Sequence, residues 1–328
     1  MQNVEKDKKF TYNIKQCKII DKIIKSGVYE MNKIFKSIAI LLILSFSIIG
    51  CSNNEIVKED QLGITNEIQI GENHEDEGME VDNIPEEESI EDNVEEESTV
   101  EYINIVSEEV RIPILMYHSI SDDDPNNSLL VPPDMFDEQM AWLEENNFTS
   151  MSMDEAIEAM NTGKVPKRPV VITFDDGYMD NYTSAFPSLK EHNMKGTFFV
   201  ITSGVDNGYY MSSDMLREMQ DAGMIIENHT ENHVELNNLS REEAIDEIRN
   251  AQTFLREVIG AEANYLCYPV GRYSDETIEI AKELGIKAAV TTQGGISQIT
   301  DGNYELKRVR VSPMSIEGFA EIFSEYIY

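Results

Sequence analysis

Two adjacent carboxylates and a pair of histidines are the residues best suited to chemistry in this chain. Thr173 to Tyr178 read TFDDGY, which places Asp175 and Asp176 directly after an apolar run, and the later segment HTENH contains His229 and His233. One carboxylate and two imidazoles can hold a divalent metal with an open position, and a second carboxylate can then act as a base. The combination predicts metal-assisted hydrolysis.

Each motif alone also has a simpler interpretation. Adjacent aspartates often form a turn or cap a helix, and two histidines four residues apart also occur by chance. Adjacent carboxylates on a turn point apart, so one is expected to bind the ion and the other to serve as the base. A glycosidase acid pair is disfavoured, because neighbouring residues cannot easily flank a glycosidic bond.

The elements around these motifs alternate between strands and helices from Val110 almost to Tyr328. This alternation predicts a parallel sheet, open or closed into a barrel, with the active groups where strands end and loops begin. Helices are expected from Ser240 to Gly260 and from starts near Ser152, Asn181, Ser212 and Ser274. The expected strands are Ile112 to Tyr117, Val170 to Phe174, Gly196 to Ile201, Met224 to Glu227, Tyr265 to Tyr268, Ala288 to Thr291 and Leu306 to Val309.

Four motifs in combination carry a family resemblance: TFDDGY, HTENH, the YPVG segment that starts at Tyr268, and ILMYH at Ile114 to His118. Together they resemble the polysaccharide deacetylases of the NodB-homology type, carbohydrate esterase family 4. The resemblance covers about Ile112 to Val311. It implies a deformed (β/α) barrel that removes acetyl groups from N-acetylated hexosamines in a polymer.

The resemblance also implies roles for individual residues. Asp176, His229 and His233 become the metal ligands, and Asp175 becomes the general base that deprotonates the metal-bound water. The backbone N–H of Val270, after Pro269, stabilises the oxyanion together with the metal. The ligands suit Zn²⁺ as the default, although Co²⁺, Ni²⁺, Mn²⁺ or Fe²⁺ would also fit.

The sequence departs from the family pattern at the general acid. No histidine follows His233, where the family has a late Leu-x-x-His. In the branch resembling the poly-N-acetylglucosamine deacetylases, the histidine comes from an N-terminal strand, and His118 fits that place. We expect His118 to protonate the departing amine; the simpler interpretation is a buried histidine satisfied by the backbone.

Other departures concern the residues that orient the base and bind the sugar. The arginine ahead of the proline motif is missing, which leaves Arg272, Arg308 or Arg310 to orient Asp175, and Arg310 is favoured.

Tyr268 and Pro269 are candidates for binding substrate or orienting the base. A tryptophan common in the substrate groove is replaced near Ser213, and Glu227-Asn228 stand where the family has Gly-Ser.

Residues 31–50 look like an export signal. Lys33 and Lys36 precede an apolar run from Ile38 to Ile49 that ends at Gly50-Cys51, too short to span a bilayer comfortably. Residues 31–50 resemble a lipoprotein signal peptide, with Cys51 as the lipidated residue; ordinary secretion is the alternative. Residues 1–30 are an extended n-region or an over-called start. Cys267 has no partner for an intramolecular disulfide in the mature domain.

The net charge of -36, from 62 acidic and 26 basic residues, is unevenly distributed. Residues 55–109 hold 21 of the acidic residues and a single basic one, Lys58. A segment of this composition buries too little apolar surface to offset the conformational entropy lost on ordering. The sequence therefore predicts a disordered linker over residues 51–109, ahead of a catalytic domain over residues 110–328. Cation capture and repulsion from an anionic wall are the functional alternatives to a spacer.

These features predict a lipid-anchored, extracytoplasmic enzyme of bacteria that deacetylates N-acetylglucosamine residues of peptidoglycan or of an exported β-1,6-linked polymer. The alternative is a cell-wall lipoprotein that binds glycan without turnover and uses the metal for structure. The expected partners are the polysaccharide and the membrane, with no nucleic acid.

Overall fold

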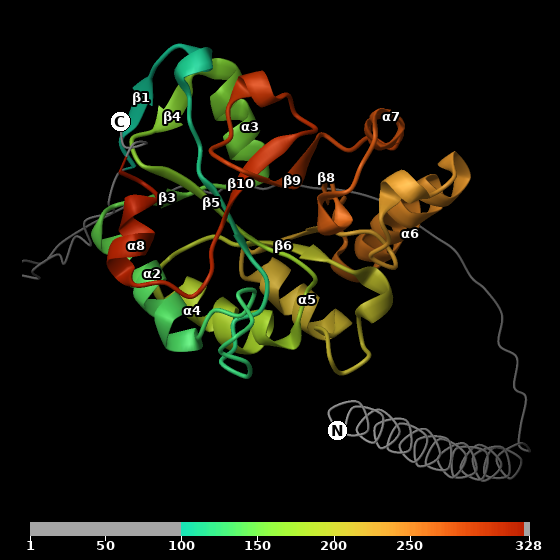
Figure 1. Ribbon diagram of the computed structural model, residues 1–328, viewed down its shortest axis with the longest axis horizontal. Coiled ribbons are helices and arrows are strands. Elements are labelled where there is room, and N and C mark those ends of the chain that lie inside the picture. Colours follow the sequence, from blue (N-terminus) through green and yellow to red (C-terminus); the bar gives the residue numbers. More distant parts are fainter. Residues whose placement is uncertain (1–99, 325–328) are drawn as a thin grey trace, which may run out of the picture. The chain divides into compact units, whose positions relative to one another are not determined.

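A ring of parallel strands forms the centre of the protein (Figure 1). The computed structural model describes residues 100–324. In this part of the chain the ring order is β2-β10-β9-β8-β7-β6-β5, and pairing of β2 with β5 closes it. The strands are β2 (Ile114–Tyr117), β5 (Pro169–Phe174), β6 (Thr197–Val200), β7 (Ile225–Asn228), β8 (Tyr265–Cys267), β9 (Ala288–Gly294) and β10 (Leu306–Arg310). The expected barrel and its seven expected strands are confirmed.

Helices cover the outside of the ring (Figure 1). They are α2 (Pro133–Glu145), α3 (Met153–Thr162), α4 (Phe186–Glu191), α5 (Ser213–Asp221), α6 (Arg241–Ile259), α7 (Asp275–Glu283) and α8 (Ile316–Glu321). The expected α6 is confirmed: Ser240 and Glu243 form a capping box, and Gly260 ends the helix in the left-handed region. The start expected near Asn181 is a π-helical turn, Asn181–Ala185, that leads into α4. No helix in residues 100–324 combines the length and apolarity that a membrane crossing requires.

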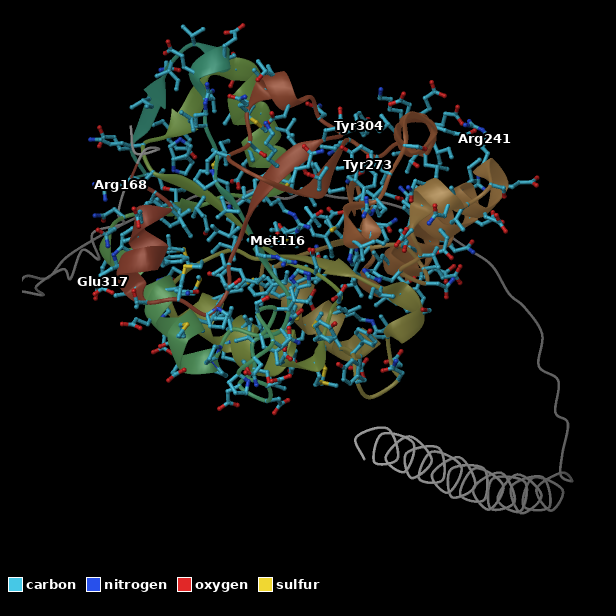
Figure 2. All side chains as sticks on the ribbon, in the orientation of Figure 1. Met116, Arg168, Arg241, Tyr273, Tyr304 and Glu317 are labelled. Carbon is cyan, nitrogen blue, oxygen red and sulfur yellow. The ribbon has the colours of Figure 1, made fainter. Side chains whose placement is uncertain are left out.

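Side chains alternate between the inside and the outside of the ring with the period of two that strands impose. On β5, Val170, Ile172 and Phe174 join the apolar layer beneath α2, α4 and α5, whereas Val171 faces the interior cluster. The same alternation sends Thr173 and Asp175 inward. Met116 of β2, labelled in Figure 2, is 2% exposed.

The end of the barrel at which the strands begin is closed by additional elements. Apolar residues of α3, including Met153, Ala156 and Met160, share one core cluster with Ile114 and Val171 of the ring. Three short strands also lie at this end: β3 (Thr149–Ser150) pairs with the start of β5, and β1 (Tyr102–Asn104) pairs with β4 (Lys164–Pro166). We call this the lower end, and the end where the strands finish the rim.

The fold begins earlier than the sequence predicts. β1 lies ahead of the expected boundary at residue 110, and Ile103 and Ile105 pack against the core cluster of the lower end. The acidic composition of residues 55–109 as a whole led to the assignment of this stretch to the linker, although residues 102–109 hold only two acidic residues, Glu108 and Glu109. Residues 102–109 therefore belong to the catalytic domain rather than to the linker. Residues 1–99, with the expected signal peptide and Cys51, lie outside the described part.

Candidate metal centre and catalytic site

Asp176, His229 and His233 converge at the rim. Asp176 follows β5, and both histidines follow β7, two strands along the ring. The Asp176 Oδ1 lies 3.3 Å from His229 Nε2 and 3.4 Å from His233 Nε2, and the three candidate ligand atoms all lie within 4.8 Å of one another. This donor set suits a divalent ion such as Zn²⁺, and a three-residue set leaves coordination positions open. The sequence-predicted ligands are brought together.

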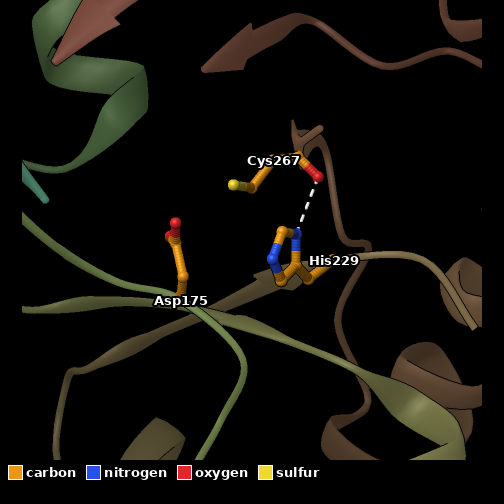
Figure 3. Close-up of side chains that lie close together, drawn as sticks. All are labelled: Asp175, His229 and Cys267. Carbon is orange, nitrogen blue, oxygen red and sulfur yellow. Dashed lines mark hydrogen bonds between the residues drawn. The ribbon is translucent and has the colours of Figure 1, made fainter. Parts of the chain in front are cut away.

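The tautomer of His229 fits metal binding. Its Nδ1 lies 2.8 Å from the backbone carbonyl oxygen of Cys267, as the dashed line in Figure 3 shows. A carbonyl oxygen only accepts hydrogen bonds, so Nδ1 carries the proton and the Nε2 lone pair points toward Asp176. Metal-bound histidines are usually held in this way by a backbone carbonyl or a carboxylate.

A second group of possible donors, Asp175, His229 and Cys267, also lies close together (Figure 3). Metal binding by a cysteine requires the thiolate, and burial raises the pKa of the Cys267 thiol. Asp175 is engaged elsewhere, as described below. The Asp176 group is therefore the better candidate centre.

The loop that carries the histidines is fixed by its own polar residues. The Asn228 Oδ1 accepts the N–H of Thr230 at 2.7 Å, and the Asn228 amide donates to the Ile248 carbonyl of α6 at 2.9 Å. The Thr230 Oγ1 accepts the N–H of His233 at 3.1 Å. Asn228, one of the two residues that depart from the family pattern, thus holds the turn between the two ligands. Its neighbour Glu227 is buried and accepts the backbone N–H of Tyr265.

Arg308 holds Asp175 inside the barrel. Its two terminal nitrogens donate to the two Asp175 carboxylate oxygens at 2.7 and 2.8 Å. The remaining N–H groups reach Thr173 Oγ1 at 3.0 Å, the Thr291 carbonyl at 2.9 Å and Cys267 Sγ at 3.3 Å. Since a guanidinium has five N–H donors, all of them are engaged at a residue with no exposed surface.

This pair determines the charge state of Asp175. Burial acts to raise the pKa of the carboxyl, but the charge and hydrogen bonds of Arg308 outweigh it and hold the pKa well below its ordinary value. Asp175 is therefore ionised at neutral pH. It lies beside the metal ligands, and both of its carboxylate oxygens accept hydrogen bonds from Arg308.

The preference for Arg310 as the orienting residue is wrong. Arg310 ends β10, pairs in register with Met116 and is exposed, whereas Arg308 lies two residues deeper on the same face. Period-two alternation places both side chains on one face, so the sequence alone did not distinguish them.

His118 also reaches the site. It follows β2, which neighbours β5 in the ring, and its Nε2 lies 3.8 Å from Asp175 Oδ2. Burial lowers the pKa of His118, while the charges of Asp175 and Asp176 oppose that effect.

Hydrogen bonds from the segment after TFDDGY hold the backbone around His118. The Asn181 amide donates to the His118 carbonyl at 2.7 Å, and Asp180 accepts from Ser119 Oγ and from the Ile120 N–H. Sequence reasoning missed this support, although Asp180-Asn181 follow TFDDGY after a single residue, Met179.

Val270 has the backbone geometry of a strained functional residue. It follows β8 with φ 48° and ψ 18°, in the left-handed region that β-branched residues rarely adopt, and its side chain is 53% exposed. Pro269 is buried beside it. The prediction of a substrate contact for the Tyr268 side chain is wrong, because the ring is fully buried and stacks on Tyr273 at 4.5 Å.

Comparisons with known proteins agree with this geometry. Residues 162–289 match the polysaccharide deacetylase family. The chain is 36% identical over 230 residues to YxkH of Bacillus subtilis (strain 168), assigned by name as a polysaccharide deacetylase, with 70% of this chain and 81% of YxkH covered. It is 27% identical to the poly-β-1,6-N-acetyl-D-glucosamine N-deacetylase of Staphylococcus epidermidis, with 62% of this chain and 80% of that protein covered.

A solved structure shows the same architecture. The Streptococcus pyogenes deacetylase PplD, in complex with acetate, superposes with a TM-score of 0.63 at 34% sequence identity, covering 65% of this chain and 98% of PplD. The shared barrel, the rim motifs and the extent of these matches show that this chain is an enzyme of the polysaccharide deacetylase family, carbohydrate esterase family 4, with the NodB-type fold.

Proposed function

We propose that this protein is a divalent-metal-dependent hydrolase that removes N-acetyl groups from N-acetylglucosamine residues of a cell-surface polysaccharide. The observation that carries the proposal is Asp175, an ionised carboxylate that lies beside the ligand set and is held by Arg308 instead of joining that set. A binding protein with a structural metal has no need for such a group. The similarity to the S. epidermidis poly-β-1,6-N-acetyl-D-glucosamine N-deacetylase supports the substrate class.

Each residue of the site has a distinct role in amide hydrolysis. When bound, a divalent ion polarises the acetamide carbonyl and lowers the pKa of a water molecule, with Zn²⁺ as the expected ion. Asp175 accepts a proton from the attacking water, and the N–H of Val270 donates to the developing oxyanion. His118 delivers a proton to the departing sugar amine. Its 3.8 Å separation from Asp175 exceeds a hydrogen bond, as is common before substrate binds.

The proposed location follows from the segment ahead of the barrel. Lipidation at Cys51 would anchor the chain on the extracytoplasmic face of the bacterial membrane, and the acidic segment would let the domain reach the wall. Without lipidation the protein would be secreted. A Cys51→Ala variant tests the anchor: persistence in the membrane fraction after signal processing would count against it.

The substrate is tested by acetate release from two polymers, peptidoglycan and a β-1,6-linked N-acetylglucosamine polymer. The chelated protein should release little acetate, and added zinc should restore release. The resemblance of the His118 segment to the poly-N-acetylglucosamine deacetylases favours the β-1,6-linked polymer. Release that survives chelation and is accompanied by new reducing ends would point instead to glycosidase chemistry.

Asp175→Asn separates catalysis from glycan binding. We expect it to lower kcat by about 10²- to 10⁴-fold, the range for a general base, while the bound metal is retained. Asp221→Asn, at an exposed position on α5, is the matched control and should leave kcat unchanged. If Asp175→Asn keeps its metal and its fold and releases acetate at the unmodified rate, the protein is not the proposed enzyme.

A further inference from the structure

Three tyrosines from two loops form an aromatic cluster at the rim. Tyr178 follows the Asp175-Asp176 pair, and Tyr209 and Tyr210 lie in the loop between β6 and α5. The Tyr178 and Tyr210 rings stack with centroids 5.4 Å apart, and Tyr209 meets both edge to face, at 5.6 Å from Tyr178 and 5.1 Å from Tyr210. These three residues are called the tyrosine cluster below.

Backbone hydrogen bonds fix the two loops against each other. Met179 donates to the Tyr209 carbonyl at 3.2 Å, and Met211 donates to the Gly177 carbonyl at 3.0 Å, on either side of a bridge between Tyr178 and Tyr210. Gly204 lies against the Tyr210 ring, where an added Cβ would approach a ring carbon to 2.6 Å. The tyrosine cluster is therefore preorganised rather than a set of loose surface side chains.

The cluster adjoins the metal centre. Tyr178 lies two residues after the ligand Asp176. In ring order, the loop of Tyr209 follows β6, the histidine loop follows β7, and Val270 follows β8. The loops of Tyr209 and Val270 therefore flank the histidine loop on its two sides.

Exposure distinguishes Tyr209 from its two neighbours. Tyr178 and Tyr210 are partly buried and contribute to packing, whereas Tyr209 is 65% exposed. Only five large hydrophobic side chains are exposed in residues 100–324: three lie near β1, and the other two are Tyr209 and Val270. An exposed aromatic ring held on a rigid loop at the rim offers a large amphipathic contact surface beside the metal centre.

We propose that Tyr209, supported by Tyr178 and Tyr210, is the stacking wall for a pyranose ring adjacent to the residue that is deacetylated. This inference rests on the proposed function. A pyranose presents a face of C–H groups bordered by hydroxyls, which matches the electron-rich face of an aromatic ring and the hydroxyl of a tyrosine. Ser213, near the place where the family resemblance puts a groove tryptophan, has no aromatic ring, and Tyr209 would supply one from the loop just before it. Tyr209 is a substrate-positioning residue: it contacts a second sugar of the polymer, next to the one that is deacetylated.

The test compares substrates of different length. The probes are N-acetylglucosamine and its β-1,4- and β-1,6-linked pentamers, together with 4-nitrophenyl acetate, which has no sugar. For Tyr209→Ala we expect KM for a pentamer to rise about three- to tenfold, the value of one aromatic contact, with kcat unchanged. Hydrolysis of 4-nitrophenyl acetate should be unaffected, and Tyr209→Phe should retain most of the affinity.

The control is Tyr102→Ala, which removes an exposed tyrosine from β1 at the lower end. An unchanged KM for the pentamers in Tyr209→Ala would overturn the inference. So would an equal loss on 4-nitrophenyl acetate, which would indicate a structural role. If the unmodified protein hydrolyses 4-nitrophenyl acetate but releases no acetate from any N-acetylated sugar, the proposed function itself fails and the inference fails with it.

Discussion

The two ends of the barrel place different residues in the left-handed region of backbone space. Turns that lead into strands, at the lower end, use only glycine or asparagine there: Asn147, Gly163, Asn193, Gly223, Gly260, Gly285 and Gly302. Loops that follow strands, at the rim, use Asp176, Thr230, His233 and Val270 as well as Asp206 and glycines. Glycine and asparagine tolerate this conformation, whereas threonine and valine adopt it at a cost.

The difference shows where the fold accepts strain. A residue held in an unfavourable backbone region costs about 1–3 kcal/mol, and it persists only where the surroundings enforce it. At the rim these residues are two candidate metal ligands, the threonine that ties them together, and the proposed oxyanion donor. The lower end, where apolar residues of α3 pack against the ring, raises the free energy of unfolding. The strained backbone at the rim lowers it and in return fixes the geometry of the site.

The largest expected contrast between the two ends concerns their histidines. His118→Ala should lower kcat by about 10²- to 10⁴-fold, because the leaving amine loses its proton donor. Metal content, measured on the purified variant, should be unchanged. His192→Ala, at the lower end, is the matched control and should keep full activity. Loss of metal from His118→Ala would make that residue a ligand and would remove its role as general acid.

The next contrast lies within one strand. Arg308→Met leaves the Asp175 carboxylate buried without its partner and should lower the free energy of unfolding by about 3–5 kcal/mol. Arg310→Met, two residues along the same strand and exposed, should change it by no more than about 0.5 kcal/mol. Urea denaturation of both variants measures the difference. Equal destabilisation would mean that the buried pair does not anchor the rim.

The arginine pair also shows what sequence can and cannot reveal. Apolar runs and capping residues predicted the seven strands of the ring, and the strand ends predicted that Asp176, His229 and His233 would meet. The depth of a residue along β10 depends on its register with β2 and β9, which includes an irregularity between Leu306 and Arg308. No local pattern encodes that register, so Arg308 was not distinguished from Arg310.

Three further differences have other physical causes. The helix α2 carries an apolar face with Phe136, Met140 and Leu143 and starts at Pro133, yet its N-cap residue is Pro132, so the usual polar capping residue that signals a helix start is missing. The strands β1, β3 and β4 have only two or three residues, too few for alternation to be recognised. A substrate contact was predicted for Tyr268 because its neighbours are motif residues, but its own ring lies in the core.

A smaller effect should follow from exchanging the backbone preferences of the two ends. Val270→Asn places a residue that tolerates positive φ at the rim and should raise the free energy of unfolding by about 0.5–1 kcal/mol. Gly163→Ala at the lower end should lower it by at least about 1 kcal/mol, because φ is 78° and the Cβ would meet the Ile105 carbonyl oxygen at 2.0 Å. Thermal unfolding of both variants checks the opposite signs. A destabilised Val270→Asn would mean that the rim is not strained there.

The smallest effect is a pH dependence confined to the lower end. Burial lowers the pKa of His192, but a 2.8 Å contact with Glu144 and the charge of Asp137 outweigh it and raise the pKa above its ordinary value. The folded state therefore holds this proton more tightly than the unfolded state. Its contribution to stability is complete below about pH 6.5, the ordinary pKa of histidine, and is lost as pH rises through the folded pKa.

His192→Asn should consequently destabilise the protein more at pH 5.5 than at pH 8.5, by about 0.3–1 kcal/mol, since both acidic partners are roughly half exposed. The measurement is the difference in urea stability between variant and unmodified protein at each pH. Titration of the rim residues is common to both proteins and cancels in that difference. A deficit of equal size at both pH values would mean that His192 contributes through packing, and charge would then play no part in stabilising the lower end at this position.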